Sequence, residues 1–182
     1  MAVAYADTYV NLAFAAADVN AGKDPSAGAA AYTNSFNGAT ATTLYNYDDS
    51  LNILTTQIPP NNGVLNTVGI SGLSVNLTDA TTDMDIFFDE TSSTNIALLS
   101  ANTGIQTIDQ LFRVNLATGL AIPAGFIGFG IPVTDIAVLV ERVVPDTLAG
   151  RLVYALTSTN NLISFDAEAP GIVRDIIPVT GV

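Results

Sequence analysis

The fold of this chain is predicted from three similar runs: TTLYNYD at Thr42–Asp48, DQLFRVN at Asp109–Asn115 and NNLISFD at Asn160–Asp166. Each run has a leucine, an apolar residue three positions later and a closing Asp or Asn. A repeat of about 40–50 residues that holds four short strands is typical of propeller blades. One four-stranded sheet cannot bury both of its faces alone, so such units stack on their neighbours.

The sequence around these runs is also typical of an all-β protein. Short apolar stretches recur between turn-forming pairs such as Asn37-Gly38, Asn62-Gly63 and Pro170-Gly171. Thr, Asn, Gly and Ser are abundant whereas Lys and Glu are scarce, and this composition disfavours surface helices.

We therefore predict a single all-β domain over residues 1–182, a propeller-like stack of about three four-stranded blades plus an extra N-terminal strand. The strand and its loop are assigned to residues 1–27, and the blades to residues 28–81, 82–133 and 134–182. Thr8–Ala15 is predicted as a lone strand whose own blade is missing. The alternative is an ordinary β-sandwich, in which the three runs resemble one another by chance.

The composition excludes several classes of function. The chain has 182 residues, 17 acidic and 5 basic side chains, a formal net charge of −12, and no Cys, His or Trp. Without Cys and His there is no disulfide, thiol nucleophile or Ser-His-Asp triad, and the commonest zinc ligands are missing. The negative charge repels phosphate backbones, so we expect no nucleic-acid partner. We expect no membrane insertion either, because the longest apolar stretch, Gly119–Val133, is short and interrupted by Pro and Gly.

Two acidic segments are candidate calcium sites. Asp18, Asn20 and Asp24 place oxygen donors at alternate positions, like the first half of a calcium loop, although the closing Glu and the flanking helices of an EF-hand are missing. The alternative is a solvated turn. Asp83 and Asp85 point to one face of a predicted strand, where paired carboxylates bind calcium or act as acid and base on a glycoside. The alternative there is a solvated edge that discourages aggregation.

The chain resembles a family of bacterial, mostly exported proteins, the domain of unknown function DUF4394. The resemblance is carried by AAAYTNSFNGATATTLYNYDDSLNILTTQIPPNNGVLNTVG (Ala29–Gly69), LFRVNLATGLA (Leu111–Ala121), LVYALTSTNNLISFDAEAPGIVRDIIPVTG (Leu152–Gly181) and DVNAGKDPSAG (Asp18–Gly28). The family's opening type of segment comes last here, so the chain resembles the end of one family unit joined to the start of the next. The resemblance implies a propeller-like fold and no known reaction. It also implies an extracellular or cell-surface location, although the N-terminus lacks the basic residues of a signal peptide.

From these features we expect a non-enzymatic structural or surface protein that associates with copies of itself, with fibres built by strand exchange as one form. Open sheet edges are templates for another chain, and an extended donor segment completes a neighbour's sheet. The predicted donor is the N-terminal strand, and Ile172–Val179 is the other candidate. Self-association is assigned to the apolar and aromatic side chains Tyr5, Tyr9, Val10, Leu12 and Phe14.

Three other functions stay open at this point. One is a calcium- or sugar-binding module, one is a carboxylate-based hydrolase, and one is a part of a larger propeller with no separate role. We expect no catalytic residue, and no cofactor other than the calcium alternative.

Overall fold

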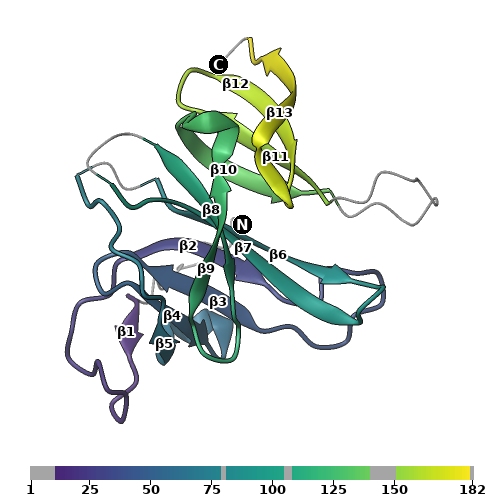
Figure 1. Ribbon diagram of the computed structural model, residues 1–182. Helices are drawn as coiled ribbons and strands as arrows, with labels where there is room; N and C mark the ends of the chain where they lie inside the picture. The colour runs from purple at the N-terminus through teal and green to yellow at the C-terminus, as the bar shows by residue number, and fades with distance from the viewer. Residues whose placement is uncertain (1–10, 79–80, 105–107, 140–150, 181–182) are drawn as a thin grey trace, which may run out of the picture.

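Figure 1 shows the computed structural model, which describes residues 11–78, 81–104, 108–139 and 151–180. These residues form thirteen strands in three sheets and two short 3-10 helices. Sheet one contains β1 (Ala13–Phe14), β2 (Ala27–Tyr32), β3 (Leu44–Asp48), β4 (Ile53–Gln57) and β5 (Val64–Ile70). Sheet two contains β6 (Asp83–Asp89), β7 (Thr94–Asn102), β8 (Asp109–Val114) and β9 (Ala121–Phe126). Sheet three contains β10 (Val133–Val138), β11 (Leu152–Thr157), β12 (Asn161–Asp166) and β13 (Ala169–Pro178). The 3-10 helices are η1 (Pro60–Asn62) and η2 (Ile127–Phe129).

Apart from β1, the strands of each sheet follow one another as an antiparallel meander. In sheet two the order is β6-β7-β8-β9, and in sheet three it is β10-β11-β12-β13. The first strands of the three sheets, β2, β6 and β10, lie next to one another, so they are the inner strands of the stack. An ordered series of sheets, each running from an inner to an outer strand, is the arrangement of propeller blades.

Sheet two is the middle layer of the stack, because one of its faces packs on sheet one and the other on sheet three. Leu98 and Leu99 on β7 are both fully buried and belong to different cores. Leu99 packs in the core between sheets one and two, and Leu98 in the core between sheets two and three. Consecutive residues of a strand point to opposite faces, so one apolar pair supplies both cores. Each such leucine contributes about 1.5–3 kcal/mol through burial.

The predicted fold class is confirmed: the protein is all-β and propeller-like, with four strands per sheet and an extra N-terminal strand. Three stacked sheets also differ from the two sheets of a sandwich. The expectation that the extra strand belongs to a missing blade is wrong. β1 pairs parallel with β5 at the outer edge of sheet one, because Phe14 finds an apolar site beside Ile53 and Leu65 there.

One of the three repeated runs does not occupy the position that the repeat implies. Leu111 and Leu162 both lie on the third strand of their sheets, β8 and β12, whereas Leu44 lies on the second strand, β3. The match of Thr42–Asp48 to the other two runs is therefore wrong as a blade position. An alternating apolar pattern recurs on every strand that is buried between two layers, so it does not report the place of the strand in its sheet.

Candidate functional site

Asp83 and Asp85 join sheets two and three at their inner strands. Asp83 Oδ2 accepts a hydrogen bond from the Ile136 amide at 2.8 Å, and Asp85 Oδ2 accepts one from the Val138 amide at 2.7 Å. β10 is the first strand of its sheet, so its inner edge carries amides that no further strand pairs. The two carboxylates satisfy these amides, and β6 is therefore not the solvated edge considered above. The partners lie 53 residues further along the chain, and no local sequence signal indicates them.

Asp83 also contacts Asp135, the carboxylate on the neighbouring inner strand. Burial raises the pKa of Asp83 to about 7, the Ile136 amide opposes this rise, and the hydrogen bond and negative charge of Asp135 add to it. Two carboxyl groups in direct contact favour one shared proton. The pair differs from a glycosidase dyad, whose carboxyl groups are about 5–10 Å apart with the sugar between them. The sequence predicted the importance of Asp83 and missed Asp135.

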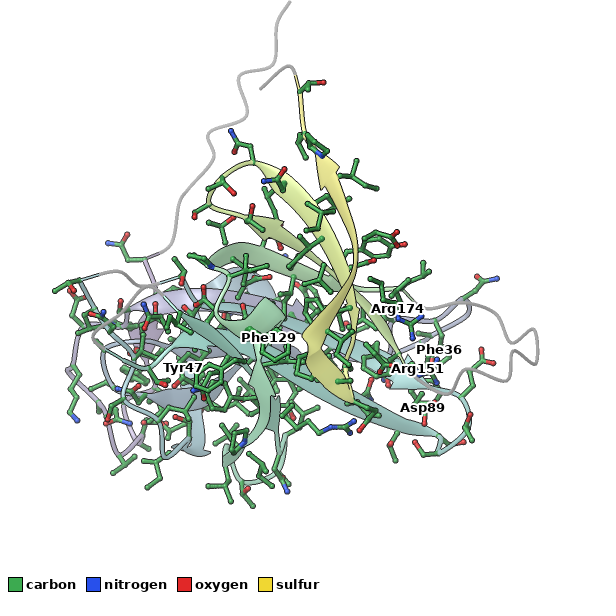
Figure 2. The ribbon with its side chains drawn as sticks, turned by 45° about the horizontal axis from the view of Figure 1, so that its top comes forward. Phe36, Tyr47, Asp89, Phe129, Arg151 and Arg174 are labelled. Atoms are coloured by element: carbon green, nitrogen blue, oxygen red, sulfur yellow. The ribbon has the colours of Figure 1, made fainter. Side chains whose placement is uncertain are left out.

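A second contact joins the same two sheets at the other end of β6. Arg151 lies beside Asp89 (Figure 2) and forms an ion pair with it. Its guanidinium carbon lies 5.3 Å from the centre of the Phe87 ring. The Ser92 hydroxyl lowers the pKa of the Asp89 carboxyl most, and Arg151 lowers it further, while burial acts in the opposite direction. A cation over a ring and a carboxylate beside it together position the start of β11, the second strand of sheet three, on sheet two.

The segment of the predicted calcium loop fastens the N-terminal part of the chain to sheet one. The Asp18 carboxylate accepts hydrogen bonds from the Thr67 amide at 2.6 Å, the Thr67 hydroxyl at 2.7 Å and the Asn20 amide at 2.8 Å. Burial raises the pKa of Asp18, but these hydrogen bonds outweigh it, so the pKa lies below its ordinary value. Lys23 Nζ donates to Asn20 Oδ1 at 2.8 Å, and Asp24 is exposed.

In these contacts the side-chain oxygens of Asp18 and Asn20 accept hydrogen bonds from other groups of the protein. The described parts of the chain contain no cluster of three or more Asp, Glu, His or Cys that could hold a metal ion. The partner Thr67 lies 49 residues away from Asp18, so the spacing of the acidic residues alone could not reveal this role.

The predicted self-association residues fall into two groups. Tyr5, Tyr9 and Val10 lie outside the described residues. Leu12 and Phe14 pack on Ile53 and Leu65 of their own sheet. Main-chain hydrogen bonds from the Ala13 amide to the Gly63 carbonyl and from the Ala15 amide to the Leu65 carbonyl, both 2.9 Å, hold the strand there.

The last sheet presents an apolar surface on its side away from sheet two, which we call the open face of sheet three. The strand registers place Leu156, Leu162 and Ile177 in one row across this face, and Tyr154 and Leu152 in the neighbouring rows. Ile177 is 54% exposed and the others are half-buried. The apolar cores of the described residues lie between sheets one and two, between sheets two and three, and beside β1. None of them covers this face. The predicted second donor, Ile172–Val179, belongs mostly to β13, which pairs with β12 at the outer edge of this sheet.

In the described parts of the chain, no helix is both long enough and apolar enough to cross a membrane.

Solved structures similar to this chain have very different sequences. Two variants of an exo-β-1,3-galactanase from Phanerochaete chrysosporium, each solved with β-1,3-galactotriose, match 92% of this chain and 40% of their own at 13% identity, with TM-scores of 0.51 and 0.50. A complex of BBS1N with ARL6DN matches 83% of this chain and 43% of that chain at 16% identity, with a TM-score of 0.48. The chain thus spans about two-fifths of the length of these structures. At such identities the likeness to the galactanase concerns the fold alone. No curated protein matches the sequence.

The family match covers most of the chain. Residues 2–137 match the model of a domain of unknown function, DUF4394. This range contains sheets one and two and nearly all of β10. Three of the four stretches that carry the resemblance, Asp18–Gly28, Ala29–Gly69 and Leu111–Ala121, lie inside it, and Leu152–Gly181 lies outside it. The chain therefore belongs to the DUF4394 family.

Proposed function

We propose that this protein is a non-enzymatic structural protein, located outside the cell or at its surface, that associates with copies of itself. The observation that carries the proposal is the open face of sheet three. In sheet two the corresponding side chains Leu98 and Leu111 are fully buried beneath sheet three. In sheet three the residues at these positions, Tyr154 and Leu162, are only half-buried, and Ile177 on the outer strand is 54% exposed. Sheets of a stack are stabilised by covering such faces, and another copy supplies a cover of the same kind.

The contacts of the acidic side chains support a structural role over a catalytic one. Asp83 and Asp85 are engaged with the amides of Ile136 and Val138, and Asp18 is engaged with Thr67. A general acid or base must reach the atom of the substrate to which it transfers a proton. These carboxylates instead join one part of the fold to another. The proposed location rests on the resemblance to a mostly exported family.

Strand exchange is one way in which copies could associate. β1 is a two-residue strand on the outer edge of sheet one, and the β1 of a neighbour would make the same contacts with β5. Association through sheet three does not need this exchange. Deletion of residues 1–15 separates the two routes, since it removes the donor strand and leaves sheet three intact.

The test is the molecular mass in solution, measured by light scattering at concentrations up to about 100 µM, where weak interfaces still associate. We expect the wild type to form oligomers, Ile177→Asp to weaken them, and the deletion variant still to assemble. Ile70→Asp is the matched control, because Ile70 is a 72% exposed isoleucine on β5 of sheet one. If the wild type stays monomeric, self-association is refuted. If the wild type and Ile177→Asp assemble but the deletion variant is monomeric, the copies associate by strand exchange.

A further inference from the structure

The open face of sheet three repeats the amide-binding position of sheet two. Asp83 lies opposite Ser100, which lies opposite Leu111 on β8. Asp135 lies opposite Leu156, which lies opposite Leu162 on β12. Because β8 and β12 are the third strands of their sheets and carry matching runs, Asp135 occupies in sheet three the position of Asp83 in sheet two. Asp135 is exposed, and a carboxylate has acceptor capacity for more than its contact with Asp83.

The inner strand of sheet one has the complementary feature, a row of amides that no described strand pairs. β2 is the first strand of its sheet, and among the described strands it pairs with β3 alone. The amide of Thr33, which follows β2, donates to the carbonyl of Thr43, which precedes β3. Amides alternate in direction along a strand, so the amides of Ala30 and Tyr32 point away from β3, to the free edge. Both residues are exposed, and the strand AGAAAY carries no charge. The small side chains of β2 allow another backbone or carboxylate to approach closely.

Charge decides which surface can cover the open face. Asp135 and Asp175 both lie on this face, in the rows of Leu156 and Tyr154. Two such faces packed on each other would bring carboxylates of two copies together, which is unfavourable. The uncharged β2 edge brings amide donors to the carboxylate instead. The complementary surfaces lie at opposite ends of the stack, so the contact is head-to-tail.

We propose that β2 of a second copy docks on the inner end of the open face of sheet three, where Asp135 accepts a hydrogen bond from one of the two outward amides, that of Ala30 or Tyr32, as Asp83 accepts one from Ile136. This inference rests on the proposed self-association and names the two surfaces that meet. A head-to-tail contact continues from copy to copy and forms either a closed ring or an open filament.

Cysteine cross-linking tests the pairing, because the chain has no cysteine of its own. Ala30 on β2 and Ala137 beside Asp135 on β10 are both exposed, so each can be replaced by cysteine. Under mild oxidation we expect the double variant Ala30→Cys/Ala137→Cys to form a ladder of covalent oligomers, and each single variant to stay uncross-linked. A covalent dimer of Ala137→Cys alone means that two open faces meet, and this overturns the head-to-tail inference while self-association stands. Failure of every variant and of the wild type to associate overturns both proposals.

Replacement of the acceptor gives a second, independent readout. We expect Asp135→Leu to weaken association about 10-fold or more, since it removes a charged acceptor of amide hydrogen bonds. Asp175→Asn is the control, because Asp175 lies on β13 of the same face, away from the inner strand, and accepts from the Ser164 hydroxyl at 3.1 Å. Equal affinities of the Asp135→Leu variant and the wild type would refute the role of Asp135. Circular dichroism of both variants shows that they are folded.

Discussion

Replacing Asp83 by Asn is expected to change how the stability of the protein depends on pH. The pKa of Asp83 is raised from 3.8 to about 7 in the folded protein, first by burial and further by Asp135. Between these two values the folded protein holds a proton that the unfolded chain has lost. Stability therefore falls as the pH rises from about 4 to about 7, and the whole penalty is present above that range.

The size of this effect follows from the shift in pKa. A rise of the pKa from 3.8 to about 7 corresponds to about 4 kcal/mol of stability at most, since each tenfold change in proton affinity is worth about 1.36 kcal/mol. Asp83 is half-buried and its carboxyl contacts that of Asp135, so we expect the measured effect to be about 2–4 kcal/mol. Asparagine has no such charge, keeps an acceptor for the Ile136 amide and can donate to Asp135. Asp83→Asn should therefore match the wild type near pH 4 and exceed its stability at pH 7.5.

The assay is urea unfolding of both proteins at pH 4 to 8, followed by circular dichroism. Asp85→Asn is the matched control, because it removes a carboxylate from the same face of β6, one that accepts the Val138 amide at 2.7 Å. We expect this control to keep the pH dependence of the wild type between pH 4 and 7. If Asp83→Asn shows the same decline in stability with pH as the wild type, the reasoning about the Asp83–Asp135 contact is refuted.

Three further changes test other contacts of the fold by urea unfolding. Gly28→Ala should destabilise the protein by about 2–3 kcal/mol, because the added methyl group would overlap the Asp49 carboxylate and the Thr82 hydroxyl that donates to it. An unchanged midpoint of urea unfolding would contradict this. Asp18→Ala should lower the stability by about 2–3 kcal/mol, because three hydrogen bonds to the carboxylate are lost. The segment around residues 11–26 should then become sensitive to protease, and resistance equal to that of the wild type would count against this. Arg151→Ala should cost about 1–2 kcal/mol through loss of the ion pair and the ring contact, with the exposed Arg174→Ala as a control of smaller effect.

The sequence predicted the class of fold because its signals are local. Alternating apolar residues and turn pairs report strands directly, and no residue outside the strand is needed to recognise them. The same local character explains the error at Thr42–Asp48. The run is a strand with the expected pattern, but its place as the second strand of sheet one depends on pairing with β2 and β4.

The candidate sites were predicted less well, because an acidic residue has the same appearance in a metal site, a solvated edge and a structural contact. Asp18 and Asp83 were identified as unusual from their spacing. Their partners Thr67 and Ile136 lie 49 and 53 residues away. Asp135 had no neighbouring acidic residue on its strand to mark it, and it became significant only when β10 was placed against β6.

The sequence by itself determined that the protein is all-β, built from repeated sheets, acidic, and without the residues of thiol or histidine chemistry, since composition and period-two patterns are properties of the chain alone. Only the tertiary structure decided that β1 adds to sheet one, that Asp83 and Asp85 hold the next inner strand, and that no core of the described residues covers the apolar face of sheet three. The physical reason is that a hydrogen-bond partner or a covering layer comes from a distant part of the chain. Its identity is set by the packing of whole sheets.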